Sequence, residues 1–89
     1  MTSILFKRTQ SISETTIDDE VVVMDLANGD FFSLTGTALE MWNLIDGIRD
    51  NAAIIAELAA KFAVAPDEIV GDVTEFIDQA LAAGLLEYR

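Results

Sequence analysis

The chain has no cysteine and no histidine, so two of the side chains on which enzymes most often rely are missing. Without cysteine there is no disulfide framework and no thiolate metal site. Without histidine, the usual general base and the commonest metal ligand are absent as well. The serines therefore have no histidine partner, no glycine-rich phosphate loop is present, and "DGIRDN" lacks the alternating acidic residues of a calcium loop. This composition argues against an enzyme and predicts that no metal or cofactor is bound.

Basic residues are also scarce, with 5 Lys and Arg against 16 Asp and Glu, for a formal net charge of −11. Such a field repels nucleic-acid phosphates and anionic membrane surfaces, and it favours a basic partner. The same charge also fits a simple role in solubility. The apolar run Ile4 to Phe6 is too short for a signal peptide or a membrane span, and Lys7 and Arg8 follow it instead of preceding it. We expect a cytoplasmic protein.

The length and the hydrophobic content set the scale of the fold. The 89 residues are 52% hydrophobic, which is enough for a packed core and argues against disorder. No linker, repeat or low-complexity tract interrupts the chain. The sequence therefore predicts a single domain over residues 1–89.

The first part of the chain has the texture of β-strands. Residues 11–17, "SISETTI", and residues 20–26, "EVVVMDL", are rich in Ser, Thr, Val and Ile, which favour strands. Asn28-Gly29 is a strong turn signal, and "DFFSL", residues 30–34, follows it as a third strand. The end of the chain, "LLEYR", is expected to fold back on the core as a short extended piece.

Three helices are predicted from the change to a helical period after Thr35. Residues 37–46 place Leu39, Trp42 and Ile45 on one face, with Thr35 or Thr37 as the cap and Gly47 as the stop. The second helix is capped by Asp50 and carries an apolar stripe of Ala52, Ile55, Leu58, Ala59 and Phe62. The third runs from Pro66 to Ala83, with Asp67 and Glu68 favourable at its start and Gly84 as its stop.

The loop between the second and third strands has two possible lengths. A two-residue Asn28-Gly29 turn would place Leu26 opposite Phe31 and split the apolar residues between both faces. A three-residue loop from Ala27 to Gly29 places Met24 opposite Phe32 and Val22 opposite Leu34, with Leu26 on the same side. We favour the three-residue loop because it gives one apolar face. Phe31, Ser33, Val21, Val23 and Asp25 would then point away from the helices.

Three strands followed by three amphipathic helices indicate an α+β fold that resembles a winged helix-turn-helix. That shape raises the question of DNA binding, and the charges argue against it. A recognition helix needs Arg, Lys, Asn or Gln to reach phosphates and base edges. The third helix has no basic residue; its charged residues are Asp67, Glu68, Asp72, Glu75 and Asp78.

The chain also resembles a known family, the PqqD peptide chaperones of pyrroloquinoline quinone biosynthesis and their relatives. The resemblance covers about four fifths of the chain and lies in the order of several spaced elements. These elements are the strand-turn-strand with Phe32 and Leu34, Trp42 followed by "LIDG", "DVTEFI" from Asp72 to Ile77, and Gly84-Leu85-Leu86. The sequence looks more like the stand-alone modules of other peptide clusters, such as lasso peptides, than like the quinone-pathway chaperones themselves.

This resemblance implies a non-catalytic recognition element for ribosomally made, post-translationally modified peptides. The leader of a precursor peptide would add as a strand between the third strand and the third helix. The module would then deliver it to a modifying enzyme such as a leader peptidase, a cyclase or a radical SAM enzyme. The peptide-binding residues implied are Phe31, Phe32, Ser33 and Leu34 on the strand, and Asp72, Val73, Phe76, Ile77 and Ala80 on the helix.

Two alternatives stay open from the residues alone. Val73, Phe76 and Ile77 fit a role in the core as well as a role at a groove, and a winged-helix-like interaction or regulatory domain without a leader peptide has the same elements. At Ala80 the chain departs from the family pattern, in which this position is a large aliphatic residue. Either a rotated helix face or a more open groove would follow.

Overall fold

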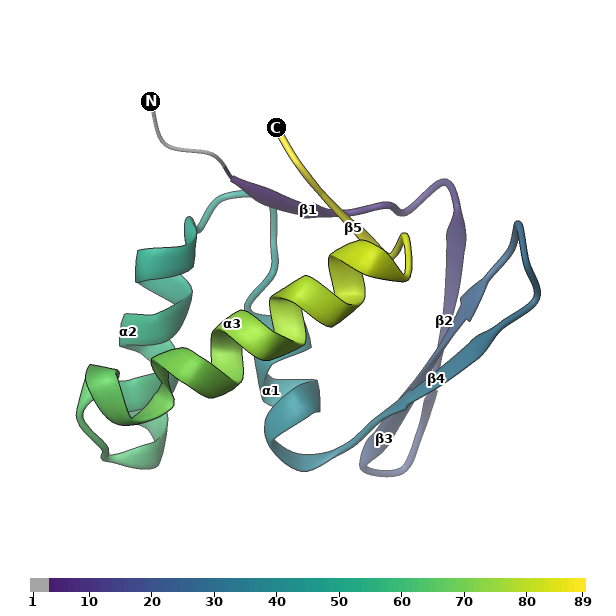
Figure 1. The fold of residues 1–89 in the computed structure, drawn as a ribbon. Helices are drawn as coiled ribbons and strands as arrows, with labels where there is room; N and C mark the ends of the chain where they lie inside the picture. The colour runs from purple at the N-terminus through teal and green to yellow at the C-terminus, as the bar shows by residue number, and fades with distance from the viewer. Residues whose placement is uncertain (1–3) are drawn as a thin grey trace.

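The computed structural model describes residues 4–89 and contains two small sheets and three helices (Figure 1). The strands are β1 (Leu5–Lys7), β2 (Ile12–Ile17), β3 (Glu20–Asp25), β4 (Phe31–Leu34) and β5 (Leu86–Tyr88). The helices are α1 (Gly36–Asn43), α2 (Asn51–Phe62) and α3 (Pro66–Ala82). The predicted α+β order of three strands and three helices is confirmed. Met1, Thr2 and Ser3 of the predicted domain lie outside the described residues.

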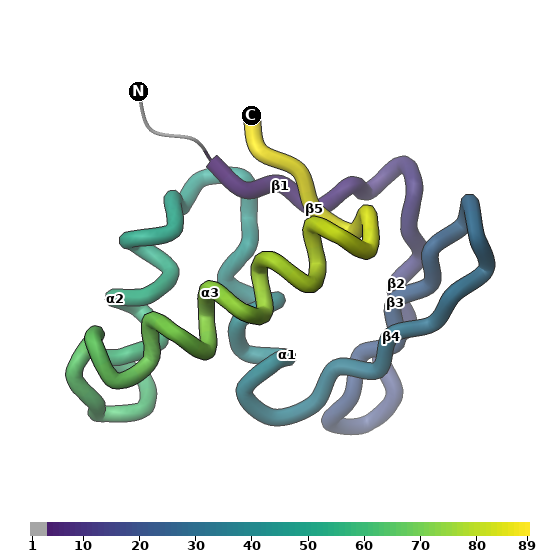
Figure 2. The backbone as a smooth tube through the Cα atoms, in the orientation of Figure 1, coloured from purple at the N-terminus to yellow at the C-terminus, as the bar shows by residue number. Residues whose placement is uncertain are grey.

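The N-terminal strand β1 was not predicted, and it gives the C-terminal segment its partner. β1 and β5 pair antiparallel, with Leu5 opposite Tyr88 and Lys7 opposite Leu86. The two ends of the described chain therefore lie side by side (Figure 2). Leu5 and Leu86 are buried in this pair, which closes one side of the core. The expectation that "LLEYR" ends in a short extended piece is confirmed by β5.

The larger sheet has the order β2-β3-β4, and its second hairpin corrects the predicted loop. Val23 lies opposite Phe32 and Val21 opposite Leu34, one residue away from the predicted register. The loop therefore has four residues, Leu26 to Gly29, and the Asp25 N–H donates to the Asp30 carbonyl at 2.8 Å. The Asp25 carboxylate fixes this loop, because it accepts bonds from the Ala27 N–H at 3.0 Å and from the Asn28 side chain at 2.9 Å.

A slip of one residue moves a whole strand to the other face of a sheet. Val21, Val23 and Asp25 are accordingly buried, although the predicted register placed them on the outer face. Val22 and Met24 take the outer face instead, and Leu26 lies exposed in the loop. On β4, which keeps its predicted orientation, Phe32 and Leu34 face the helices while Phe31 and Ser33 point outward.

The helices cover the inner face of this sheet and complete the core. Trp42 and Ile45 are buried as predicted, while α1 ends at Asn43, before the predicted Gly47. Asp50 caps α2 by accepting a hydrogen bond from the Ala53 N–H at 2.8 Å, as predicted, whereas the side chain of Thr35 makes no cap bond at α1. The predicted stripe of α2 is partly wrong, because Ala52 and Phe62 are exposed and Ile54 is buried instead. Gly84, with a φ of +79°, follows α3 as the predicted stop.

Candidate functional site

The β4 strand is an edge of the sheet, and its backbone is the first component of the site. It pairs with β3, and within residues 4–89 no strand lies on its other side. Paired residues in an antiparallel ladder alternate between hydrogen-bonded and non-hydrogen-bonded positions. Because the Asp25 N–H bonds to the Asp30 carbonyl, Phe32 and Leu34 are the β4 residues that bond to β3. The N–H and C=O groups of Phe31 and Ser33 therefore point outward along the free edge.

An apolar groove of about 470 Å³ lies beside this edge. β4 forms one of its sides, and α1, the second half of α3 and the residues after α3 form the rest. The lining residues are Phe31, Phe32, Ser33, Leu34, Ala38, Trp42, Phe76, Gln79, Ala80, Ala83 and Leu85. Gln79 is the one long polar side chain among them. An extended chain in this groove would therefore have the unpaired backbone groups of β4 on one side and the apolar wall formed by the helices on the other.

The structure separates the residues that the sequence analysis grouped on α3. Phe76 is half-buried and, with Ala80, lines the groove together with all four residues of β4. Val73 and Ile77, predicted on the same wall, point into the core and are 1% and 3% exposed. Asp72 is exposed and lies one turn before Phe76, outside the groove lining. Whether these residues contact a bound peptide stays a prediction.

Several lining residues were not singled out from the sequence as part of the site. Ala38 and Trp42 come from α1, and Leu85 comes from the turn after α3. Gln79 and Ala83 continue the α3 wall, and their spacing from Phe76 and Ala80 was the signal that could have revealed them. Ala38, Ala80 and Ala83 are small, so the floor of the groove stays open between larger residues. The departure from the family pattern at Ala80 thus coincides with an open groove.

Trp42 forms the inner end of the groove and is held by polar groups on its other sides. Its indole N–H donates to the Glu14 carboxylate at 2.7 Å, across from α1 to β2. The Lys7 ammonium lies 4.7 Å from the centre of the same ring, a cation–π contact. Burial lowers the pKa of Lys7, and the nearby carboxylates of Glu14 and Asp46 oppose that shift. The orientation of the indole ring is therefore fixed from β1 and β2.

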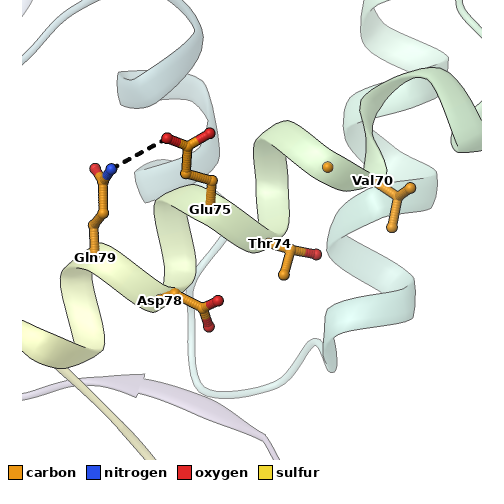
Figure 3. A pocket seen from close by; sticks show the side chains of 6 residues that line it. Val70, Thr74, Glu75, Asp78 and Gln79 are labelled. Atoms are coloured by element: carbon orange, nitrogen blue, oxygen red, sulfur yellow. Dashed lines mark hydrogen bonds between the residues drawn. The ribbon is translucent and has the colours of Figure 1, made fainter.

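A second hollow lies along the solvent-facing side of α3 (Figure 3). All of its lining residues belong to α3: Val70, Gly71, Thr74, Glu75, Asp78 and Gln79. Glu75 and Gln79 extend to one side of the helix, where the Gln79 amide donates to Glu75 at 3.4 Å, while Thr74 and Asp78 point elsewhere (Figure 3). Because one helix alone supplies its walls, this hollow has no second surface to hold a ligand. We regard the groove beside β4 as the candidate site.

Among residues 4–89, no group of three or more His, Cys, Asp and Glu side chains is arranged to hold a metal ion. No helix in this range is long and apolar enough to cross a membrane. Five carboxylates and no cation lie along α3, so this helix does not present a phosphate-binding surface.

The chain is similar to known proteins in sequence and in fold. The family described as coenzyme PQQ synthesis protein D (PqqD) has a sequence model that matches residues 20–86. A solved structure of TbiB1, in complex with the TbiA(beta) leader peptide, is similar to this chain with a TM-score of 0.81 and 26% identity. The similarity covers 92% of this chain and 95% of TbiB1. Among curated proteins, none matches the chain.

Proposed function

The chain belongs to the PqqD family, and on this basis we propose that it binds the leader of a ribosomally made precursor peptide and delivers it to a modifying enzyme. The family match confirms the resemblance found in the sequence. The similar protein TbiB1 was solved with a leader peptide bound, which supports the same kind of ligand here. The enzyme partner would be a leader peptidase, a cyclase or a radical SAM enzyme.

The observation that carries the proposal is the free edge of β4 beside an apolar groove. Phe31 and Ser33 offer two outward N–H groups and two outward C=O groups, which form a template for an added strand. Main-chain bonds supply affinity that depends little on sequence. The groove formed with Phe76 and Ala80 supplies selectivity, because it can accept side chains of the added strand.

The register of β4 defines how a leader would sit. Side chains of neighbouring strands at opposed positions point to the same face. Leader residues opposite Phe32 and Leu34 would therefore enter the groove, and those opposite Phe31 and Ser33 would lie on the outer face. The residues we assign to binding are Phe31, Phe32, Ser33, Leu34, Phe76 and Ala80. Val73 and Ile77 support the wall from the core, and Asp72 extends it by one turn.

The module is proposed to be a binding partner without catalytic activity of its own. The groove contains no side chain that could serve as a nucleophile with a matched base, since its polar members are Ser33, Gln79 and the indole N–H of Trp42. The Ser33 hydroxyl donates to Glu20 on the outer face of the sheet, not into the groove. We expect no cofactor and no nucleic acid, and a cytoplasmic location where the precursor is translated.

The test is a titration of the isotope-labelled full chain with the leader half of a short precursor peptide encoded beside its gene. Amide shifts should concentrate on residues 30–34 and 72–83, and the core half of the same precursor should cause none. Shifts confined to other regions would contradict the groove. If the leader half does not bind, and a folded partner protein pairs with β4 instead, the chain is an interaction domain that does not use a leader.

A further inference from the structure

The wall that α3 presents to the groove changes in character along the helix. Residues four apart lie above one another on a helix, so Asp72, Phe76 and Ala80 form one column, and Glu75, Gln79 and Ala83 form another. Phe76, Gln79, Ala80 and Ala83 line the groove, whereas Asp72 and Glu75 lie one turn earlier, outside it. Over the second half of α3 the wall is therefore apolar except for Gln79. Toward the start of the helix it is acidic, with Asp72 one turn before Phe76 and Glu75 one turn before Gln79.

The basic side chains that form ion pairs or cation–π contacts in residues 4–89 form them with groups outside this acidic turn. Arg49 pairs with Asp46 and Lys61 pairs with Glu40. Lys7 lies over Trp42, and Arg89, beside Glu87, lies over Phe6 at 4.5 Å. Arg8 directly follows β1, and α3 itself has no basic residue. No ion pair within residues 4–89 involves Asp72 or Glu75. Both are exposed, so a cation could approach them from solvent.

The direction of the two elements locates the acidic turn relative to a bound strand. β4 and α3 run in opposite directions across the fold (Figure 1). Asp72 and Glu75 therefore lie toward the Leu34 end of β4, where the chain enters α1. One helical turn rises about 5.4 Å, which is close to the advance of about two residues in a strand. A side chain two positions beyond the last one in the groove would point to the same face and reach this turn.

On the premise that the chain is a leader-binding module, we propose that its groove selects a leader with two large apolar residues at alternate positions followed, two positions further, by Lys or Arg. The apolar pair would lie opposite Phe32 and Leu34, and the open floor at Ala80 and Ala83 would admit large side chains. The basic residue would meet Asp72 and Glu75. Whether it precedes or follows the apolar pair in the leader sequence depends on whether the leader runs antiparallel or parallel to β4.

The charge pair contributes to selectivity more than to affinity. Both carboxylates are exposed, and ion pairs between exposed groups are weak and screened by salt. Replacing the basic leader residue by Gln should therefore weaken binding only about two- to fivefold at low salt. The effect should vanish at high salt, whereas replacement of an apolar groove residue should remain costly.

The experiment uses the full chain and a displayed library of random peptides of about twelve residues, long enough to span an edge strand. Four proteins are screened: the wild type, Asp72→Asn, Asp78→Asn and Ser33→Pro. Asp78 is the matched control, because it is one carboxylate on the same helix and points away from Glu75 and Gln79 (Figure 3). Only peptides that the wild type retains and Ser33→Pro loses are counted as added strands.

The expected result is a common pattern among these peptides, with two large apolar residues at alternate positions and Lys or Arg two positions beyond. Asp78→Asn should select the same pattern, and Asp72→Asn should keep the apolar pair and lose the basic preference. The inference is overturned if basic residues occur at no fixed distance from the apolar pair, or if Asp72→Asn enriches them as strongly as the wild type does. Either result would show a general attraction of basic peptides to an acidic protein. If peptides add to β4 without this pattern, the selectivity is wrong and the strand site stands. If no retained peptide depends on Ser33, both the selectivity and the proposed function fail.

Discussion

A proline at Ser33 tests the free edge of β4 directly. The N–H of Ser33 points away from β3 along the free edge of the sheet, so its removal should leave the pairing of β4 with β3 intact. The Ser33 side chain is exposed and donates a hydrogen bond to Glu20, so little else should change in the unbound protein. Ser33→Pro is thus expected to fold normally and to lose the ability to pair with an added strand at this position.

The size of the effect follows from the hydrogen bond that is lost. A net hydrogen bond contributes about 0.5 to 1.5 kcal/mol, and an acceptor left unpaired in the interface costs about 1 to 3 kcal/mol more. Together they correspond to about 1.5 to 4.5 kcal/mol, which is about a 10- to 2000-fold increase in the dissociation constant of the leader. Isothermal titration with the leader half of the precursor measures this change, and thermal unfolding shows whether the variant remains folded.

The matched control is Ser33→Ala, which keeps the backbone N–H and removes only the hydroxyl that contacts Glu20. It should bind the leader within about twofold of the wild type, since an exposed hydrogen bond contributes little. A folded Ser33→Pro protein with unchanged affinity would refute strand addition at β4. An equal loss in Ser33→Ala would show that the side chain, and not the backbone, contacts the ligand.

Three further predictions concern the groove, its inner end and the hairpin. Ala83→Phe should fill the groove and weaken leader binding about tenfold, or about 1.4 kcal/mol, whereas Ala82→Phe on an exposed face should not, as titration of both would show. Glu14→Leu should leave the buried indole N–H of Trp42 unpaired and destabilise the fold by about 1 to 3 kcal/mol in denaturant titration; Glu14→Gln keeps an acceptor and should stay close to the wild type. The hydrogen bond from the Asn28 side chain, followed by that from the Ala27 N–H, holds the pKa of Asp25 below its usual value. Because that pKa is lower in the folded protein, its contribution to stability is complete at neutral pH and is lost as the pH falls below the usual carboxyl range. Melting temperatures should therefore fall less steeply with acid in Asp25→Ala, and an unchanged slope would contradict this role of Asp25.

The local pattern of apolar, turn-forming and capping residues was sufficient to predict most of the helices and strands. The strands from Ile12 to Ile17 and from Glu20 to Asp25 appear where β-forming residues cluster, and Pro66 and Gly84 frame α3 as expected. These features depend on neighbours in the sequence, which is why they can be predicted without the fold. The strand β1 could not be, because three residues show no clear alternation and their partner is at the other end of the chain.

The predicted hairpin register was wrong because it was based on the hydrophobic pattern, which does not include the hydrogen bonds of the loop. The predicted register placed Val22, Met24 and Leu26 inside, and the observed one places Val21 and Val23 there. The difference comes from the carboxylate of Asp25, which binds its own loop and favours four loop residues. A polar residue on the inner face is thereby accepted, since its hydrogen bonds are satisfied.

The lining of the groove was predicted best where one element supplies it, and its role in binding stays a prediction. All four residues of β4 line the groove, because their position follows from the strand alone. The helix α3 was predicted correctly, but core and groove positions lie side by side around it, so Val73 and Ile77 were assigned to the groove although they point into the core. Ala38 and Leu85 come from other elements, and only the packing of α1 and α3 brings them to the groove.

The most direct test of leader addition at β4 is amide hydrogen exchange of the full chain, measured residue by residue with and without the leader peptide. The amides of Phe32 and Leu34 bond to β3 and should be protected in both states, whereas those of Phe31 and Ser33 should exchange quickly alone and slowly with the leader. New protection at Phe31 and Ser33 alone among the β4 amides is the predicted result. Leader binding that leaves both amides unprotected, or that protects the opposite edge at β2 instead, would contradict it.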